Sequence, residues 1–155
     1  MLVIHLFYAK GYERTVIVPA QIAQSFWVSA NQVSPEYLSE MGLFFANLRL
    51  NTTPSSAAMQ HDVLLRYVSS NEYETLKTEL VYEAEHIKKE HITTAFYPTD
   101  VKVDAKKLIV KVIGDLQSTV GDSQLSPKRV IYQLEFTYHA SRLLVNSFEE
   151  VKEHA

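Results

Sequence analysis

The sequence predicts an α+β domain in which three helices come first and four antiparallel strands follow. Between residues 34 and 92, apolar side chains recur at the helical period of about 3.6, whereas from Thr94 onward they recur at a period of about 2. The strands are joined by short turns, and one face of the sheet is strongly apolar. We therefore expect the sheet to curl around the helices. The length of 155 residues suits a single domain.

The first two helices begin at matching signals. Ser34 is placed to cap the first helix, with Pro35 at its first position. We expect that helix to run to Leu50 and to bury an apolar face of Tyr37, Leu38, Met41, Phe44, Phe45 and Leu48. Thr53 and Pro54 repeat the signal, and the second helix is expected to reach Val68 and to bury Met59, Val63, Leu64 and Tyr67.

The longest helical pattern runs from Glu72 to Ile92 without Gly or Pro. Asn71 and Glu74 have the spacing of a capping box. The predicted buried face contains Tyr73, Leu76, Leu80, Ala84, Ile87 and His91. A second face carries Glu79, Glu83, His86 and Glu90. We interpret it as a solvated acidic stripe, because neither other helix supplies the second Glu-x-x-His motif that a di-iron site requires.

Four strands are predicted after this helix, at residues 95–104, 108–119, 129–139 and 142–150. Pro98 indicates an edge strand or a bulge in the first of them. The third strand presents to the core Val130, Tyr132, Leu134, Phe136 and Tyr138. Nearer the N-terminus, residues 13–18 read as a short strand and residues 25–30 as a strand or an extended arm. The apolar run Leu2 to Ala9 is either a buried first strand or the trailing edge of a membrane anchor.

The composition excludes several kinds of function. A net charge of -3 provides no basic surface for phosphates, so we expect no direct nucleic-acid binding by this domain. The absence of cysteine excludes disulfides and thiol catalysis. Only four glycines are present and no phosphate-binding loop is recognisable, so a nucleotide site built from backbone amides is not expected. We predict no catalytic residues, no cofactor and no metal.

Several runs in order along the chain carry a family resemblance. They are YLSEMGLFFANLRLNTTP, LLRYVSS, YEAEHIKKEHITTAFYPTDVKV, VIGDLQSTVGD and LLVNSFEE. The most specific pieces are Leu48 to Asn51, the passage from Ala84 to Val103, and Gly114-x-Leu116 followed by Gly121-Asp122. In this order and spacing they resemble the TraE family of conjugative transfer proteins, over residues 14–150.

The resemblance implies a bitopic inner-membrane component of a bacterial type IV secretion channel. Such a protein has one membrane helix and a periplasmic domain, which is expected to adopt the nuclear-transport-factor-two-like, or cystatin-like, cone. Residues 1–13 would then be a membrane-proximal segment behind a missing N-terminal membrane helix, residues 14–150 the cone, and residues 151–155 a frayed end. The domain would be a non-enzymatic scaffold that contacts other type IV secretion subunits, or itself as a homo-oligomer, in a machine that moves single-stranded DNA and extends a pilus.

We expect the contacts at the outer face of the first helix, at Glu36, Tyr37 and Glu40, and along the exposed strand edge near Arg142. Two alternatives share the fold. A small isomerase or dehydratase would need a carboxylate or histidine pointing into the cone, and a periplasmic ligand-binding module would need an open apolar cavity. A cone filled by Phe44, Leu48 or Leu80 would argue against both.

Overall fold

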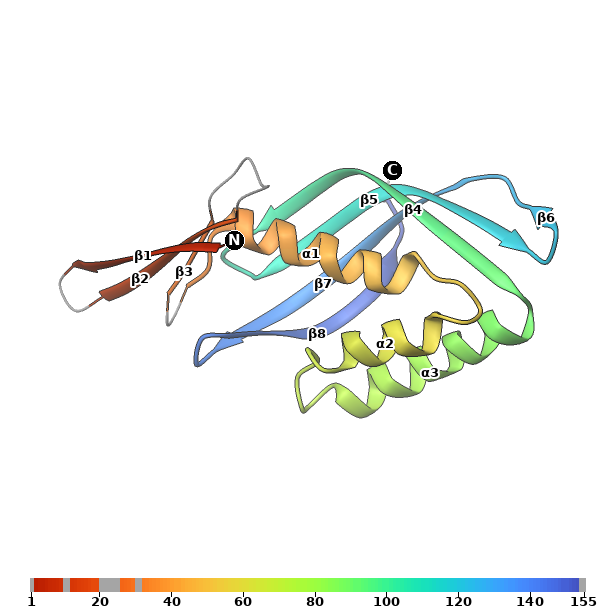
Figure 1. Ribbon diagram of the computed structural model, residues 1–155, viewed down its shortest axis with the longest axis horizontal. Helices are drawn as coiled ribbons and strands as arrows, with labels where there is room; N and C mark the ends of the chain where they lie inside the picture. The colour runs from red at the N-terminus through yellow and green to blue at the C-terminus, as the bar shows by residue number, and fades with distance from the viewer. Residues whose placement is uncertain (1, 10–11, 20–25, 30–31, 154–155) are drawn as a thin grey trace.

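A computed structural model of the chain describes residues 2–9, 12–19, 26–29 and 32–153 (Figure 1). Three strands, β1 (Leu2–Ala9), β2 (Tyr12–Pro19) and β3 (Phe26–Val28), form an antiparallel sheet in that order. The strands expected at 13–18 and 25–30 thus correspond to β2 and β3, although Ser25 and Ala30 lie outside the described residues. Met1 and the last two residues of the predicted frayed end also lie outside them.

The C-terminal sheet is antiparallel, with the order β4 (Ile92–Asp104), β5 (Ile109–Val120), β7 (Lys128–His139) and β8 (Arg142–Val151). A fifth, two-residue strand, β6 (Ser123–Gln124), pairs with β5, so the prediction of four strands missed one that was expected to be loop. The four long strands were predicted in their correct order, and β8 runs one residue beyond its predicted end. Figure 1 shows the three helices on one face of this curved sheet.

The helices are α1 (Pro35–Leu50), α2 (Ala57–Leu65) and α3 (Tyr73–Lys89). The predicted start of α1 is confirmed, because the Ser34 hydroxyl accepts the backbone N–H of Tyr37 and Pro35 is the first helical residue. The predicted start of α2 is wrong by three residues. Thr53 and Ser56 bond to each other across a turn, Thr53 Oγ1 accepting the Ser56 N–H and Ser56 Oγ the Thr53 N–H, and the helix begins only after that turn.

The capping box expected at Asn71 and Glu74 is also wrong. The residue before α3 is Glu72, which is itself in a helical conformation and makes no side-chain cap hydrogen bond. The buried face of α3, by contrast, matches the prediction at Leu76, Leu80, Ala84 and Ile87. The predicted burial of His91 is wrong, because α3 ends at Lys89 and His91 is exposed in the turn that follows.

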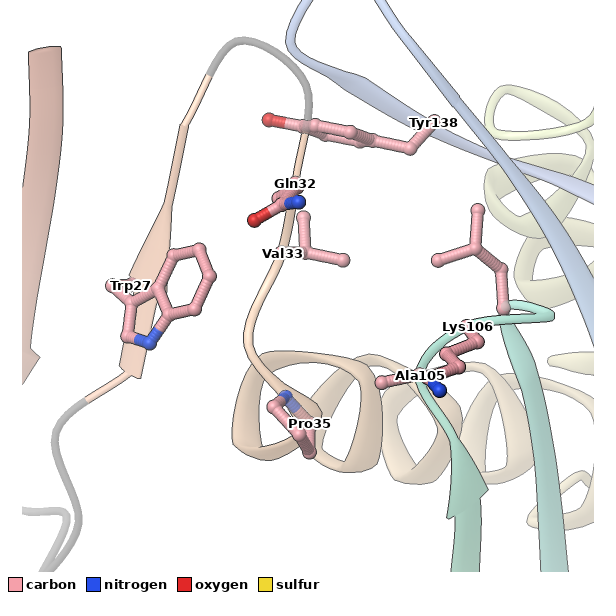
Figure 2. A pocket seen from close by; sticks show the side chains of 8 residues that line it. Trp27, Gln32, Val33, Pro35, Ala105, Lys106 and Tyr138 are labelled. Carbon is pink, nitrogen blue, oxygen red and sulfur yellow. The ribbon is translucent and has the colours of Figure 1, made fainter. Parts of the chain in front are cut away.

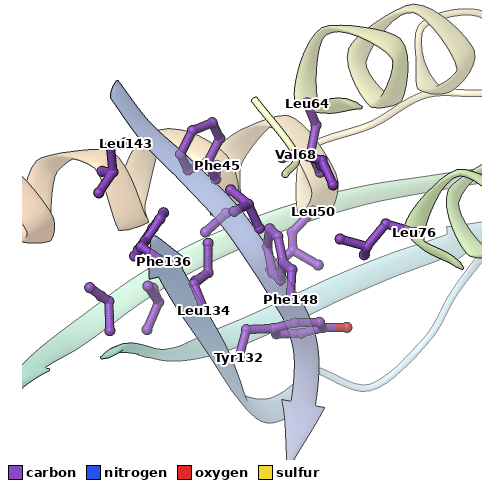
Figure 3. Close-up of a cluster of buried hydrophobic side chains, with 14 of the residues drawn as sticks. Phe45, Leu50, Leu64, Val68, Leu76, Tyr132, Leu134, Phe136, Leu143 and Phe148 are labelled. Atoms are coloured by element: carbon purple, nitrogen blue, oxygen red, sulfur yellow. The ribbon is translucent and has the colours of Figure 1, made fainter. Parts of the chain in front are cut away.

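The core lies between the helices and the sheet, and Figure 3 shows aromatic and aliphatic side chains from both layers meeting there. Residues of β7 alternate as predicted, with Val130, Tyr132, Leu134 and Phe136 buried. The strand β5 exposes Lys111 between the buried Val110 and Val112. Its second face is therefore only partly covered.

The bulge predicted at Pro98 is present, since the register between β4 and β5 shifts between Pro98 and Asp100. Gly114 is the β5 residue paired with Pro98. A Cβ atom on Gly114 would meet the backbone carbonyl oxygen of Tyr97 and would lie 2.8 Å from the Cα of Pro98. Glycine is therefore required where the bulge brings the two backbones together.

In the described part of the chain, no helix is both long and apolar enough to cross a bilayer.

Candidate functional site

A buried arginine lies where the three helices meet the sheet. Arg49, in the last turn of α1, is 6% exposed. Its Nη2 lies 2.8 Å from Glu79 Oε1 and its Nε lies 3.3 Å from Glu83 Oε2, both on α3. Its Nη1 donates to the backbone carbonyl of Phe148 on β8. One side chain thus joins α1, α3 and the sheet.

Aromatic rings complete the environment of this guanidinium group. Arg49 Cζ lies 4.9 Å from the ring centre of Phe148 and 5.7 Å from that of Tyr132. Burial lowers the pKa of Arg49, but the charges and hydrogen bonds of Glu83 and Glu79 raise it more, so the pKa lies above its ordinary value. Burial also raises the pKa of Tyr132 to about 12, against the opposing charge of Arg49.

A buried histidine extends the cluster to α2. The Nδ1 of His61 lies 3.0 Å from the carbonyl oxygen of Leu80, which can only accept, so Nδ1 carries a proton. The Nε2 of His61 lies 3.4 Å from Glu83 Oε2. Glu83 thus faces Arg49 on one side and His61 on the other. All three helices therefore contribute charged or titratable side chains to one cluster.

This arrangement corrects the interpretation of the acidic face of α3. Glu79 and Glu83 both pair with Arg49, and Glu83 is half-buried, although the side chain of Glu79 stays 50% exposed. His86 and Glu90 do remain exposed. The sequence contains a signal for the cluster: Arg49 is four residues after the buried Phe45 and seven after the buried Gly42 on α1. An arginine on a core-facing stripe requires carboxylates nearby.

The interior of the cone is filled by side chains. Leu80, one of the three expected fillers, is fully buried. Phe45 and Phe148 are fully buried as well (Figure 3). Leu48 is half-buried. Phe44 is 40% exposed, so its expected burial is wrong: the core-facing stripe of α1 is centred on Phe45. The predicted burial of Met59 on α2 is likewise wrong, and His61 takes the inward position instead.

The predicted contact residues lie near the start of α1 and at the start of β8. Glu36 is exposed, and Tyr37 and Glu40 are half-buried. Burial and the nearby Tyr138 and Tyr67 raise the pKa of Tyr37. Tyr138 lies on β7 opposite Leu143, the residue after the exposed Arg142. The structure therefore places Tyr37 close to the hairpin from which Arg142 begins the edge strand β8.

Aromatic side chains continue along this surface. Phe44 packs edge-on against Tyr67, with ring centres 6.1 Å apart. The backbone of the segment after α2 bonds to β8 here: Val145 N–H donates to the Tyr67 carbonyl, and Ser69 N–H to the Val145 carbonyl. The edge of β8 is thus covered at Val145 by the chain itself, and Arg142 lies three residues before the covered position.

A cleft opens at the N-terminal end of α1 (Figure 2). Its volume is about 460 Å³, and its walls come from β3, the turn between β4 and β5, and β7. Trp27 and Tyr138 provide aromatic walls, and Lys106 provides a cation. The hydroxyl of Tyr138 donates to the carbonyl oxygen of Ser29, which ties the segment after β3 to the C-terminal sheet.

Comparison with known sequences decides the family. A sequence profile described as TraE protein matches residues 1–150. The chain belongs to the TraE family. Protein TraE of Escherichia coli (strain K12) is 33% identical over 115 residues, which cover 74% of this chain and 61% of that protein. Protein TraE of Salmonella typhi is 31% identical over 139 residues, covering 90% and 74% of the two chains. The family is one of conjugative transfer components and is not a known enzyme family.

Solved structures show the same fold. A structure titled "TraE protein in complex with 2-Chloroisonicotinic Acid" superposes with a TM-score of 0.62 at 14% identity, covering 77% of this chain and 97% of that one. The VirB8 protein of Agrobacterium tumefaciens superposes with a TM-score of 0.58 at 10% identity, covering 78% and 94%. The expected α+β fold of three helices on an antiparallel sheet is thus shared with TraE and VirB8 structures.

Proposed function

We propose that the chain is a non-enzymatic assembly component of a conjugative type IV secretion channel. Membership of the TraE family carries this proposal. We further propose that residues 14–150 form a nuclear-transport-factor-two-like cone in the periplasm, behind an inner-membrane anchor that precedes the chain. The three helices lying on one face of the curved sheet support this form of the fold (Figure 1). The match to the Escherichia coli relative covers 61% of that protein's length.

The arrangement of ionisable groups also supports a scaffold over an enzyme. Catalysis inside the cone would need a carboxylate or histidine free to meet a reactant. Glu79 and Glu83 instead face Arg49, and the ring of His61 is held by the carbonyl of Leu80. These contacts join helices to one another and to the sheet, which is a structural role.

We place the contacts with other subunits on the surface formed by Glu36, Tyr37, Glu40 and Arg142. An exposed sheet edge and half-buried aromatic side chains are features on which partner chains dock. Two charge-reversal variants test the surface: Glu36→Lys with Glu40→Lys, and Arg142→Glu. Asp122→Lys is the matched control, because Asp122 is exposed, as Glu36 and Arg142 are, but lies in the turn between β5 and β6.

Each variant would replace the native gene in a donor strain, and plasmid transfer to a recipient would be counted. We expect at least a tenfold loss of transfer with either surface variant and none with Asp122→Lys. Thermal unfolding followed by circular dichroism should be unchanged in all three, because every substituted side chain reaches solvent. Normal transfer by both surface variants would refute the placement of this surface. Normal transfer by a donor from which the gene is deleted would refute the proposed function itself.

A further inference from the structure

The outward face of α3 carries two apolar side chains that the fold leaves uncovered. Val81 is 44% exposed and Tyr82 is 73% exposed. The buried face of the same helix is formed by Leu76, Leu80, Ala84 and Ile87. Val81 lies about 100° from Leu80 around the helix, at the flank of that face. Figure 1 shows α3 at the outer rim of the helical layer, with α2 between it and α1. Another chain can therefore approach this face along its whole length.

Residues around Val81 repeat with the spacing of a coiled-coil seam. Steps of four and three residues lead in turn through Glu74, Thr78, Val81, Glu85 and Lys88. At about 100° per residue these five side chains fall within one narrow sector of the helix, with Lys77 at its border. A surface depression lies along this sector and is lined by Glu74, Lys77, Thr78, Val81, Tyr82 and Glu85. A helix that packs here would cross α3 at a small angle, as in paired coiled-coil helices.

The charges in this sector are antisymmetric about Val81. Lys77 and Glu85 each lie four residues from Val81, on opposite sides, and Glu74 and Lys88 each lie seven residues away. Each symmetric pair has opposite signs. A twofold axis through Val81 would place Lys77 of one copy against Glu85 of the second, and Glu74 against Lys88. Parallel pairing would place each charge against its own kind, so the charges favour the antiparallel arrangement.

These charges are available for a second chain. Within the described residues, none of the four forms an ion pair, and the one charged contact among them is that of Lys77 Nζ with the Tyr73 ring, at 5.7 Å. All four side chains are exposed. An isologous dimer requires a surface that is complementary to itself about a twofold axis, and the charges of this sector meet that requirement.

We infer that α3 pairs with α3 of a second copy of this chain, antiparallel and centred on Val81. The contact is separate from the surface placed on α1 and β8, and it does not depend on the proposed function. Val81 is the apolar side chain of this sector and Tyr82 lies beside it, so the isolated dimer is weak and forms at high protein concentration. Because exposed ion pairs join the copies, salt weakens it further.

Sedimentation velocity from 20 μM to 1 mM tests the pairing. We expect dimers at the upper concentrations in 50 mM salt and at least fivefold weaker association in 500 mM salt. Lys77→Glu alone and Glu85→Lys alone should each weaken association at least fivefold, because each creates like-charge contacts across the axis. The double variant Lys77→Glu with Glu85→Lys exchanges the two signs and should restore it. Unfolding temperatures should be unchanged, since both side chains are exposed.

Cysteine cross-linking gives a second test, since the chain contains no cysteine of its own. Under mild oxidation, Val81→Cys should form a disulfide dimer at least tenfold faster than Tyr97→Cys, although Tyr97, on β4, is the more exposed of the two positions. Equal rates for the two variants would overturn the inference. So would a monomer at 1 mM, or a double charge variant no better than the single ones. A dimer that is lost with Arg142→Glu but insensitive to α3 variants would also overturn it, while leaving the proposed function standing.

Discussion

The cluster of Arg49, Glu79 and Glu83 makes an asymmetric prediction about stability. The side chain of Arg49 is 5% exposed, whereas those of Glu79 and Glu83 are 50% and 33% exposed. Removing both carboxylates as Glu79→Gln with Glu83→Gln leaves a cation buried without a countercharge. Removing the cation as Arg49→Met leaves two carboxylates that water can reach. The double glutamine variant should therefore be the less stable of the two.

The magnitudes follow from the contacts. Removing one side of a buried ion pair costs about 3–5 kcal/mol, and the lower end applies here because both carboxylates are partly solvated. Arg49→Met deprives the Phe148 carbonyl of its donor, which costs about 1–3 kcal/mol. It also removes the desolvation penalty of the guanidinium group, and the methionine keeps most of the apolar stem. We expect a loss of about 3 kcal/mol for the double variant and about 1–2 kcal/mol for Arg49→Met.

Urea unfolding followed by circular dichroism measures both changes, provided that the slope of the transition is the same in all variants. The triple variant is the control: adding Arg49→Met to the double glutamine variant removes the unpaired cation and should recover part of the lost stability. If Arg49→Met costs as much as the double variant, or if the triple variant is less stable than the double, the assignment of Arg49 as the buried partner is refuted.

Two further predictions concern Tyr132 and the glycines. Burial raises the pKa of Tyr132 from 10 to about 12. The folded state therefore holds the hydroxyl proton more tightly than the unfolded chain does. The stability that results is complete below pH 10 and is lost between pH 10 and pH 12. Wild type should lose about 2–3 kcal/mol more than Tyr132→Phe over that interval in urea titrations, and parallel losses would contradict the assignment. Gly114→Ala should cost about 2–3 kcal/mol, because its Cβ meets the backbone at the bulge, which cannot move aside. The Cβ added by Gly42→Ala meets a side chain, 2.6 Å from Val110 Cγ1, and the alanine gains about 1 kcal/mol of helix propensity. Thermal unfolding should therefore show a smaller loss of stability for Gly42→Ala than for Gly114→Ala. The reverse order would refute this reasoning.

Local patterns predicted what depends on local chemistry. The Ser34 cap, the buried stripe of α3, the alternation of β7 and the bulge at Pro98 are each set by a few neighbouring residues, and each is confirmed. The cap at Asn71 failed because the turn after α2 brings Glu72 into a helical conformation and begins the helix there. The start of α2 failed because Thr53 and Ser56 satisfy each other in a turn.

The candidate site and the candidate contact surface also contain parts that the sequence could predict and parts that it could not. The position of Arg142 on an edge strand could be predicted, because the last strand of a series of hairpins lies at an edge. The pairing of Arg49 with Glu79 and Glu83 could not, since thirty or more residues separate them and each helix by itself presents only an unpaired charge beside an apolar stripe. Phe44 and Phe45 are adjacent and chemically identical, and only the packing against Tyr67 and Phe136 decides which one is buried.

The sequence by itself determined the order of helices and strands, the TraE family and the absence of disulfides. Periodicity and motif spacing are properties of short stretches of chain, so they reveal the elements and the family, and a chain without cysteine can form no disulfide. Only the tertiary structure decided where the charges lie: Arg49 inside, Glu79 and Glu83 turned toward it, and Lys77 and Glu85 left facing solvent. The physical reason is that the cost of burying a charge depends on partners that only the folded chain brings within hydrogen-bonding distance.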